Sequence, residues 1–303
     1  MKRCRSPPAA APVRPLSSAS RLQLVRCLPK QTLIRTGEKI PDIWGMSYNS
    51  ARDELFLADD NNKVVRAMGV RDNAGDLSDV YRAPHDTSPF IRSVCHMSDS
   101  DTLLVCSGKE GWPYWLVALS RNGSEWREAQ RVQTDGIGYI SCSLSGSLVL
   151  IGGENSIYME LFRVESGPRI ARVHRIHVPE MYRWFSATCG SDTLVAMSYQ
   201  NENDNSVRVH RLRGDRLEEL ARIQLKFPRK LLWLADRLLV AEFNSEKDSH
   251  AVIELEVSDM RLERRRELIA TSENISVRSL CAVNDVFAIF DSNSRDILHY
   301  SFD

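Results

Sequence analysis

The sequence lacks the features that most directly define a function. Its apolar runs are far shorter than the ~18 residues of a membrane-spanning helix, and 231–235 is typical of the longest. It has no Cys-x-x-Cys pair, no Cys and His cluster at zinc spacing, no Gly-x-Ser-x-Gly elbow and no phosphate-binding glycine loop. A membrane-spanning protein and the corresponding zinc, serine-hydrolase and nucleotide-binding classes are therefore excluded, and no catalytic residue can be named.

Acidic residues are missing from the first 37 positions, which contain eight basic residues. Because the 303 residues include 40 basic and 40 acidic ones, the remainder has 32 basic against 40 acidic residues and a net charge of −8. A net-negative body is a poor platform for a phosphate backbone. We therefore expect neither a nucleic acid nor a membrane as a partner.

The opening segment, 1–21, is rich in Pro, Ala, Ser and Arg, a composition that buries too little apolar surface to fold. It lacks the apolar centre of a secretory signal, which leaves a disordered tail or an organelle transit peptide. The seven cysteines are an odd number without the pattern of a secreted disulfide framework. These observations favour a reducing compartment, so we expect a cytoplasmic protein, with organelle targeting by the basic tail as the alternative.

A repeat runs through the rest of the chain. An anchor residue, a polar turn and an apolar run such as Leu55–Ala58 or Leu103–Cys106 recur six times, with the anchors 48, 47, 47, 44 and 48 residues apart. A nearly constant period of this length is typical of propeller blades. The six anchors are Ser47, Cys95, Cys142, Cys189, Trp233 and Cys281.

Each copy continues with alternating segments such as 207–212 and 217–225, whose period of two indicates β-strands. Four strands in about 47 residues make one propeller blade. The sixth copy ends after three strands, whereas an isolated strand, 21–28, precedes the first copy. We therefore predict one all-β domain, residues 22–303, folded as a β-propeller of six four-stranded blades in which the N-terminal strand completes the last blade and closes the ring.

Four of the anchors are cysteines at equivalent places on different blades. Packed sheets stand about 10 Å apart, too far for a disulfide between equivalent positions. We therefore expect Cys95, Cys142, Cys189 and Cys281 to be small buried thiols.

The segment Asp53–Met68 contains an Ala-Asp pair at 58–59, two asparagines at 61–62 and a Val-Val-Arg strand at 64–66. It resembles the NHL-type repeat and the related gluconolactonase-like six-bladed propellers, although only in the first blade. The Trp-Asp dipeptide of WD repeats is missing. The resemblance implies a propeller and, from its gluconolactonase-like members, one metal ion held by carboxylate and amide ligands at the channel mouth.

Three carboxylates fit that implied site. Asp59, Glu242 and Asp291 end the second strands of blades 1, 5 and 6, which are neighbours in a closed ring. Hard divalent cations bind several converging oxygens, so calcium or another divalent cation held here would give a hydrolase of lactones or esters. Asp and Asn are also the ordinary residues of tight turns, which is the competing interpretation.

The same face of the ring receives the residue three before each anchor and the loops between second and third strands. Cations and aromatics gather at these places, and together they suit an acidic peptide through charge-assisted hydrogen bonds and stacking. Packing of the aromatics between blades is the alternative. The candidate partner-binding residues are Trp44, Arg92, Trp112, Tyr114, Tyr139, Arg183, Trp184, Lys230 and Arg278.

The sequence thus predicts a non-enzymatic protein-interaction scaffold that binds a protein or acidic peptide on one propeller face and needs no cofactor. This prediction rests on analogy with other propellers as well as on the residues. The alternative is the divalent-metal hydrolase with Asp59, Glu242 and Asp291 as ligands.

Overall fold

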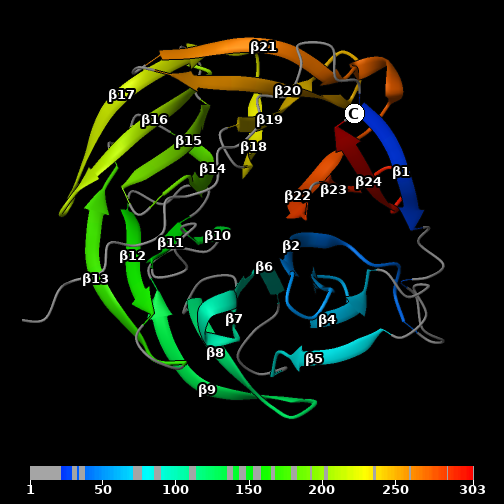
Figure 1. The fold of residues 1–303 in the computed structure, drawn as a ribbon, viewed down its shortest axis with the longest axis vertical. Coiled ribbons are helices and arrows are strands. Elements are labelled where there is room, and N and C mark those ends of the chain that lie inside the picture. The colour runs from blue at the N-terminus through cyan, green and yellow to red at the C-terminus, as the bar shows by residue number, and fades with distance from the viewer. Residues whose placement is uncertain are drawn as a thin grey trace, which may run out of the picture.

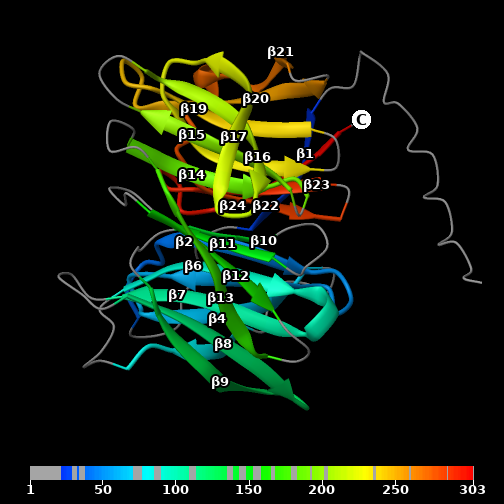
Figure 2. The same ribbon diagram turned by 90° about the vertical axis from the view of Figure 1, so that its left-hand side faces the viewer.

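Each of the six sequence repeats forms one four-stranded antiparallel sheet, and the six sheets surround a common axis (Figure 1). The predicted six-bladed propeller is therefore confirmed, and Figure 2 shows the ring from the side. The structure is a computed structural model, and it describes residues 22–28, 33, 38–70, 77–84, 90–108, 114–134, 139–142, 148–152, 158–164, 168–178, 183–191, 193–200, 204–234, 237–258, 261–284 and 286–302. The tail 1–21 lies outside these residues.

The first three blades follow one another in chain order, each running from its inner to its outer strand. Blade 1 comprises β2 (Ile43–Asn49), β3 (Glu54–Asp59), β4 (Val64–Gly69) and β5 (Ser78–Arg82). Blade 2 comprises β6 (Phe90–Met97), β7 (Thr102–Gly108), β8 (Tyr114–Asn122) and β9 (Glu125–Thr134). Blade 3 comprises β10 (Tyr139–Cys142), β11 (Leu148–Gly152), β12 (Tyr158–Val164) and β13 (Ile170–His177).

The other three blades repeat this order, except that the last one borrows a strand. Blade 4 comprises β14 (Arg183–Cys189), β15 (Leu194–Gln200), β16 (Ser206–Arg213) and β17 (Arg216–Gln224). Blade 5 comprises β18 (Pro228–Leu234), β19 (Arg237–Asn244), β20 (Ser249–Ser258) and β21 (Arg261–Ile269). Blade 6 comprises β22 (Val277–Val283), β23 (Val286–Asp291), β24 (Ile297–Phe302) and β1 (Leu22–Leu28). Two short 3-10 turns, η2 (Ser98–Ser100) and η3 (Thr271–Glu273), complete the described elements.

Strand β1 closes the ring, as predicted. It pairs antiparallel with β24 from Leu22 opposite Phe302 to Leu28 opposite Ile297, and so becomes the outermost strand of blade 6 (Figure 1). The last blade therefore contains strands from both ends of the described chain. This pairing covers an edge of β24 that would otherwise expose its hydrogen-bonding groups.

The hydrophobic core is divided into six layers, one between each pair of neighbouring blades. The second strands supply the largest share of it, because their apolar runs face a blade on both sides. Leu55, Phe56, Leu57 and Ala58 of β3 are all fully buried. Outer strands such as β21 instead alternate a few buried residues with exposed charges. No helix among the described residues has the length and apolar character needed to cross a membrane.

Small side chains let the inner strands approach closely around the axis. Side-chain hydroxyls accept backbone N–H groups across the blade boundaries, as from His96 to Ser47 at 2.8 Å and from Ile140 to Ser93 at 3.1 Å. At Gly45 on β2, a Cβ atom would lie only 2.7 Å from the Cα of Ser93 on β6. The inner strands are therefore much closer together than packed sheets usually are.

This close approach corrects one expectation about the cysteines. Cys189 and Cys281 are buried free thiols, as predicted, and burial raises the pKa of Cys281 to about 12. Cys95 is disulfide-bonded, so the prediction of a free thiol is wrong for this residue. The side chain of Cys142 lies outside the described residues. The 10 Å spacing that we assumed belongs to sheets packed face to face and does not hold beside the axis.

We predict that Gly45→Ala lowers the free energy of unfolding by about 1–3 kcal/mol, because the new methyl group meets backbone that cannot rotate away. Urea unfolding at pH 7.5 measures the change. A variant as stable as the parent chain would contradict the close approach of β2 and β6.

Two buried histidines give the fold a specific acid sensitivity. Burial, assisted by nearby cations, lowers the pKa of His210 to about 4 and that of His250 to about 3. Each folded-state pKa lies below the unfolded value near 6.5, so the unfolded chain binds more protons between these pH values. Stability is therefore full above pH 6.5 and falls as the pH drops below it.

At pH 5.5 each histidine should cost about 1.4 kcal/mol of stability relative to pH 7.5. We expect His210→Gln and His250→Asn each to remove that part of the pH dependence, whatever they do to stability at pH 7.5. Urea unfolding at the two pH values provides the difference. An unchanged difference in both variants would show that other groups titrate there.

Candidate functional site

Four of the six inner strands place an Arg or a Trp at a β-bulge near their first residue. The ladder between first and second strand skips Trp44 in β2, Arg92 in β6, Arg229 in β18 and Arg278 in β22. In β14 the skipped residue is Phe185. A bulged residue has no partner in the ladder, and bulges redirect side chains next to binding sites. The repeated bulge therefore produces a ring of redirected side chains at the end where the inner strands begin.

Trp44 is the centre of a cation–aromatic cluster that we call the Trp44 stack: Trp44, Arg92, Lys230 and Arg278. The guanidinium carbons of Arg92 and Arg278 each lie 3.9 Å from the centroid of the indole ring. The ammonium nitrogen of Lys230 lies 6.0 Å from it. These residues come from blades 5, 6, 1 and 2, which are consecutive around the ring. The stack thus brings together four residues that the sequence selected as partner-binding candidates.

Two aspartates hold the stack in place. Asp42 accepts the indole N–H of Trp44 at 3.0 Å and pairs with Arg278 at 3.4 Å and with Arg295 at 2.8 Å. Asp60 lies 3.9 Å from Arg92 and accepts the backbone N–H of Ile91 at 2.9 Å. Both aspartates are only 14% exposed, so they hold the cations from the buried side of the stack. The solvent side of the cations stays open to a ligand.

The stack retains an excess of positive charge. Arg92, Arg278 and Arg295 pair with the two aspartates, and Lys230 adds a fourth cation near the indole ring. Arg229 lies next to Lys230, with its guanidinium 4.1 Å from the ring centroid of Phe243. The side chains of Arg92 and Arg278 are 25% and 36% exposed, so solvent reaches them. A surplus of partly exposed cations on an aromatic platform favours an anionic ligand.

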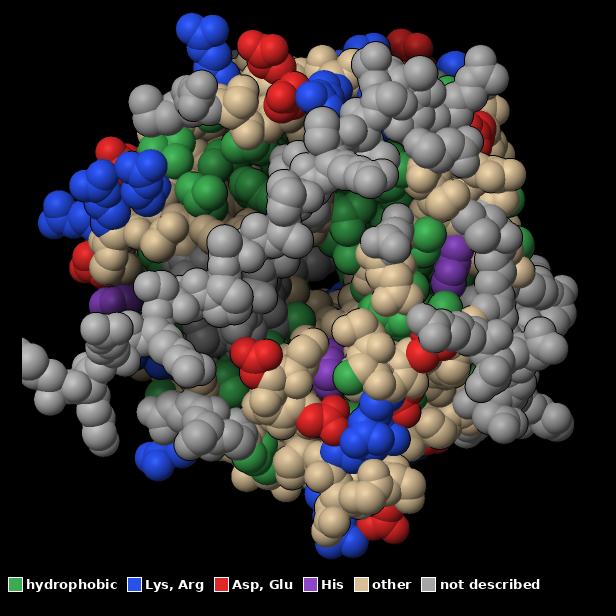
Figure 3. Space-filling view, in the orientation of Figure 1, with side chains coloured by type: hydrophobic (Ala, Val, Ile, Leu, Met, Phe, Trp, Pro, Cys, Tyr) green, Lys and Arg blue, Asp and Glu red, His purple; other side chains and the backbone are tan. Residues whose placement is uncertain are grey.

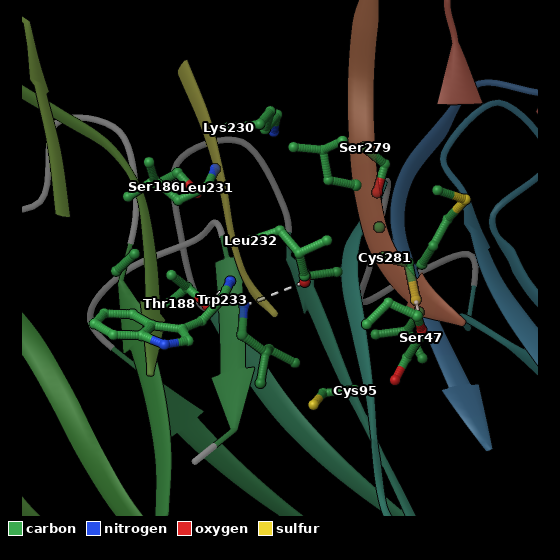
Figure 4. Close-up of a pocket in the computed structure, with 18 of the residues that line it drawn as sticks. Ser47, Cys95, Ser186, Thr188, Lys230, Leu231, Leu232, Trp233, Ser279 and Cys281 are labelled. Atoms are coloured by element: carbon green, nitrogen blue, oxygen red, sulfur yellow. Dashed lines mark hydrogen bonds between the residues drawn. The ribbon is translucent and has the colours of Figure 1, made fainter. Parts of the chain in front are cut away.

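The stack stands at one end of the central channel. The channel is a cavity of about 260 Å³ lined by the inner strands of the blades, and Trp44 and Lys230 are among its lining residues. Figure 3 shows the molecule hollowed near its centre. In Figure 4, Lys230 lies at the end where β18 begins, whereas Trp233, Cys95 and Ser47 lie deeper. The deeper lining residues are mostly small or apolar, so the charged side chains are confined to the mouth of the channel.

The other partner-binding candidates are not part of the described stack. Tyr114 begins β8, the third strand of blade 2, and is partly buried. Tyr139 begins β10 and Arg183 begins β14, with Trp184 following it, so their backbones occupy the same end of the ring. The side chains of these three, and Trp112 altogether, lie outside the described residues.

Each of the three candidate metal ligands accepts a backbone N–H from the segment that leads into its own blade. Asp59 accepts that of Asp42 at 3.2 Å, and Glu242 that of Lys226 at 2.7 Å. Asp291 accepts the N–H groups of Ser276, Asn293 and Ser294 at 2.8–3.1 Å. We call this repeated contact the carboxylate clasp. It fixes the path of the chain immediately before the bulge.

The clasp explains the positions of the acids without a metal ion. Within the described part of the chain, no three His, Cys, Asp or Glu side chains come together in a way that would hold one. Burial raises the pKa of Asp59, although Asn62, Asp42 and Arg66 act against this shift. The role of these residues as metal ligands remains a prediction from the sequence.

Sequence reasoning missed three members of the site. Asp42 anchors Trp44 and Arg278, and Arg295 pairs with Asp42. Arg229 is the bulged residue of blade 5, where the sequence predicts Lys230. One signal was present: Asp42 is two residues before Trp44, and residues two apart along an extended chain share a face. The bulge itself has no sequence signature here, which is why the blade 5 position was displaced by one residue.

No known protein-family pattern matches the sequence, and no curated protein matches it either. Solved structures do resemble the fold. The PQQ-bound aldose sugar dehydrogenase of Streptomyces coelicolor has a TM-score of 0.66 and 9% identity over 95% of this chain and 99% of its own. A chain of the mitotic checkpoint complex has a TM-score of 0.61 and 11% identity over 99% and 98%.

A third similar structure is the WD40 β-propeller domain of Doa1, with a TM-score of 0.56 and 12% identity over 92% of this chain and 97% of that one. Identities this low show a shared fold alone. Propellers similar to this chain thus include a sugar dehydrogenase and a component of a multiprotein complex, so the fold does not choose between an enzyme and a binding protein.

We predict that Asp291→Ala lowers the free energy of unfolding by about 1–3 kcal/mol in metal-free buffer, because three backbone N–H groups lose their acceptor. Asp291→Asn keeps one acceptor oxygen and should lose less. Thermal unfolding after chelation, with and without calcium, magnesium or manganese, provides the test. A rise in Tm with one ion that disappears in Asp291→Ala would support the hydrolase instead.

Proposed function

We propose that the chain is a non-enzymatic interaction scaffold that binds an acidic segment of a protein partner at the Trp44 stack. The observation that carries the proposal is the stacking of Arg92 and Arg278 on one indole ring, with Lys230 next to them. Arginine and tryptophan are the residues that dominate interface energetics. Their aromatic and cationic groups are held in place before a ligand arrives, which reduces the entropy lost on binding.

Exposed apolar side chains on the same face support a protein partner over a small anion. Ile40, three residues before β2, is 51% exposed, and Phe227, immediately before β18, is 39% exposed. Both precede an inner strand, so they lie at the end of the ring where the Trp44 stack lies. A partner with an acidic centre and apolar flanks would match the stack and these two side chains.

We also propose the cytoplasm as the place of action. The support for this proposal is that four cysteines form no disulfide, as suits a reducing compartment: Cys27, Cys106, Cys189 and Cys281. The disulfide of Cys95 is an observation against the proposal, because disulfides persist mainly in oxidising compartments.

The test is binding of a fluorescent oligoglutamate peptide, measured by anisotropy. We predict that Arg92→Glu combined with Arg278→Glu weakens binding at least tenfold, because each charge-assisted hydrogen bond contributes about 1.5–3 kcal/mol. Raising the salt concentration should weaken the binding of the parent chain in the same direction, since salt screens exposed charges.

Matched controls lie on the opposite face. Arg52, in the turn between β2 and β3, pairs with Asp101, and Arg213, at the end of β16, pairs with Glu218. Arg52→Glu combined with Arg213→Glu makes the same change in net charge and should leave binding unchanged. Equal losses in the two double variants would mean that the peptide responds to overall charge, and the proposal would fail.

A further inference from the structure

A buried histidine next to the Trp44 stack has a proton donor without an acceptor. His250, on β20 of blade 5, is 2% exposed. Its Nδ1 accepts the backbone N–H of Val277 at 3.2 Å, so in the neutral ring the proton must be on Nε2. That Nε2 is buried and has no hydrogen-bond partner. Val277 immediately precedes Arg278, so this hydrogen bond links the imidazole to the backbone of the strand that carries Arg278.

Two arginines of the stack have unsatisfied donors as well. Nη1 of Arg92 and Nε of Arg278 are buried without a hydrogen-bond partner. The contact of Arg92 with Asp60, at 3.9 Å, is an ion pair too long for a hydrogen bond. Blades 2, 5 and 6 thus each place a buried N–H without an acceptor in or next to the stack.

Buried donors without acceptors destabilise the folded state, so each one in a native protein needs an explanation, of which a bound ion or ligand is one. Burial first, and then the positive charge of Arg229, Lys230 and Arg278, which outweighs the opposing charge of Asp291, lower the pKa of His250 to about 3. His250 is therefore neutral at pH 7 and available as a hydrogen-bond donor. The excess of positive charge near the imidazole favours an anion as the missing acceptor.

We infer that the Trp44 stack recognises a phosphorylated side chain of a peptide partner, with His250 and Arg278 on one side of the phosphoryl group and Arg92 on the other. This inference rests on the proposed function and specifies the acidic group. The guanidinium carbons of Arg92 and Arg278 are each 3.9 Å from the indole centroid, so they are no more than twice that distance apart.

A phosphoryl group fits these donors better than a carboxylate. It carries a charge of about −1.5 to −2 at pH 7 and three acceptor oxygens in a tetrahedral arrangement. The unpartnered donors belong to three different residues on three blades, whereas a carboxylate offers two coplanar oxygens that one arginine can satisfy by itself. The surplus of cations over Asp42 and Asp60 also matches a dianion better than a single negative charge.

The experiment compares three fluorescent libraries of short random peptides that differ only at a fixed central residue: phosphoserine, glutamate or serine. Binding to the full-length chain is measured by anisotropy at pH 7.5. We expect the phosphoserine library to bind at least tenfold more tightly than the glutamate library. Inorganic phosphate should compete, which shows that the phosphoryl group itself is recognised.

Two variants connect the preference to the named donors. Arg278→Lys keeps the charge but removes Nε, and His250→Asn keeps an acceptor for the N–H of Val277 while removing the imidazole donor. Each should reduce the preference for phosphoserine over glutamate several-fold. Arg213→Lys, on the opposite face, is the matched control and should not change it.

The outcomes separate this inference from the proposed function. Equal binding of the phosphoserine and glutamate libraries would overturn the phosphoryl assignment and leave an acidic-peptide scaffold. A phosphoserine preference that both variants retain would also overturn the assignment to these donors. Failure of all acidic libraries to bind would overturn the inference and the proposed function together. Binding of inorganic phosphate without any phosphopeptide would point to a small phosphorylated ligand and overturn the peptide assignment.

Discussion

A propeller depends on closure of its ring, and in this chain one pair of strands provides it. Every hydrophobic layer lies between two blades, and the layer between blades 6 and 1 joins β22–β24 of the last blade to β2–β4 of the first. Pairing of β1 with β24 completes the last blade with a strand taken from the other end of the described chain. The six layers then constrain one another, since no blade can tilt without disturbing both of its neighbours.

Closure also determines the geometry of the face that carries the Trp44 stack. The inner strands converge on the axis, and the close contact at Gly45 shows how little room is left between them. The carboxylate clasps of Asp59, Glu242 and Asp291 fix the chain just before three of these strands, and the bulge follows at once. Position and direction of the Trp44 stack therefore follow from backbone geometry, whereas its chemistry follows from a few side chains.

The sequence predicted the fold well because blade structure is written in local patterns: a period near 47 residues, a buried apolar run and alternating strands. It also selected Trp44, Arg92 and Arg278, because counting back from each anchor follows strand register. The prediction from the sequence failed where the strand register changes at a bulge. The bulge moved the blade 5 position to Arg229, and the roles of Asp42, Arg295 and His250 depend on contacts across blades that no local pattern encodes. The disulfide of Cys95 was missed because the distance between strands near the axis is a property of the whole ring.

The repeated bulge has a consequence for how such a protein can diversify. A bulged residue contributes no hydrogen bond to its own ladder, so its side chain can be exchanged with little effect on the sheet. This one structural position holds a tryptophan, a phenylalanine and three arginines: Trp44, Phe185, Arg92, Arg229 and Arg278. Each of these five blades thus carries one exchangeable side chain at the same end of the ring. The side chains presented at this end of the ring can therefore change one substitution at a time while the architecture stays the same.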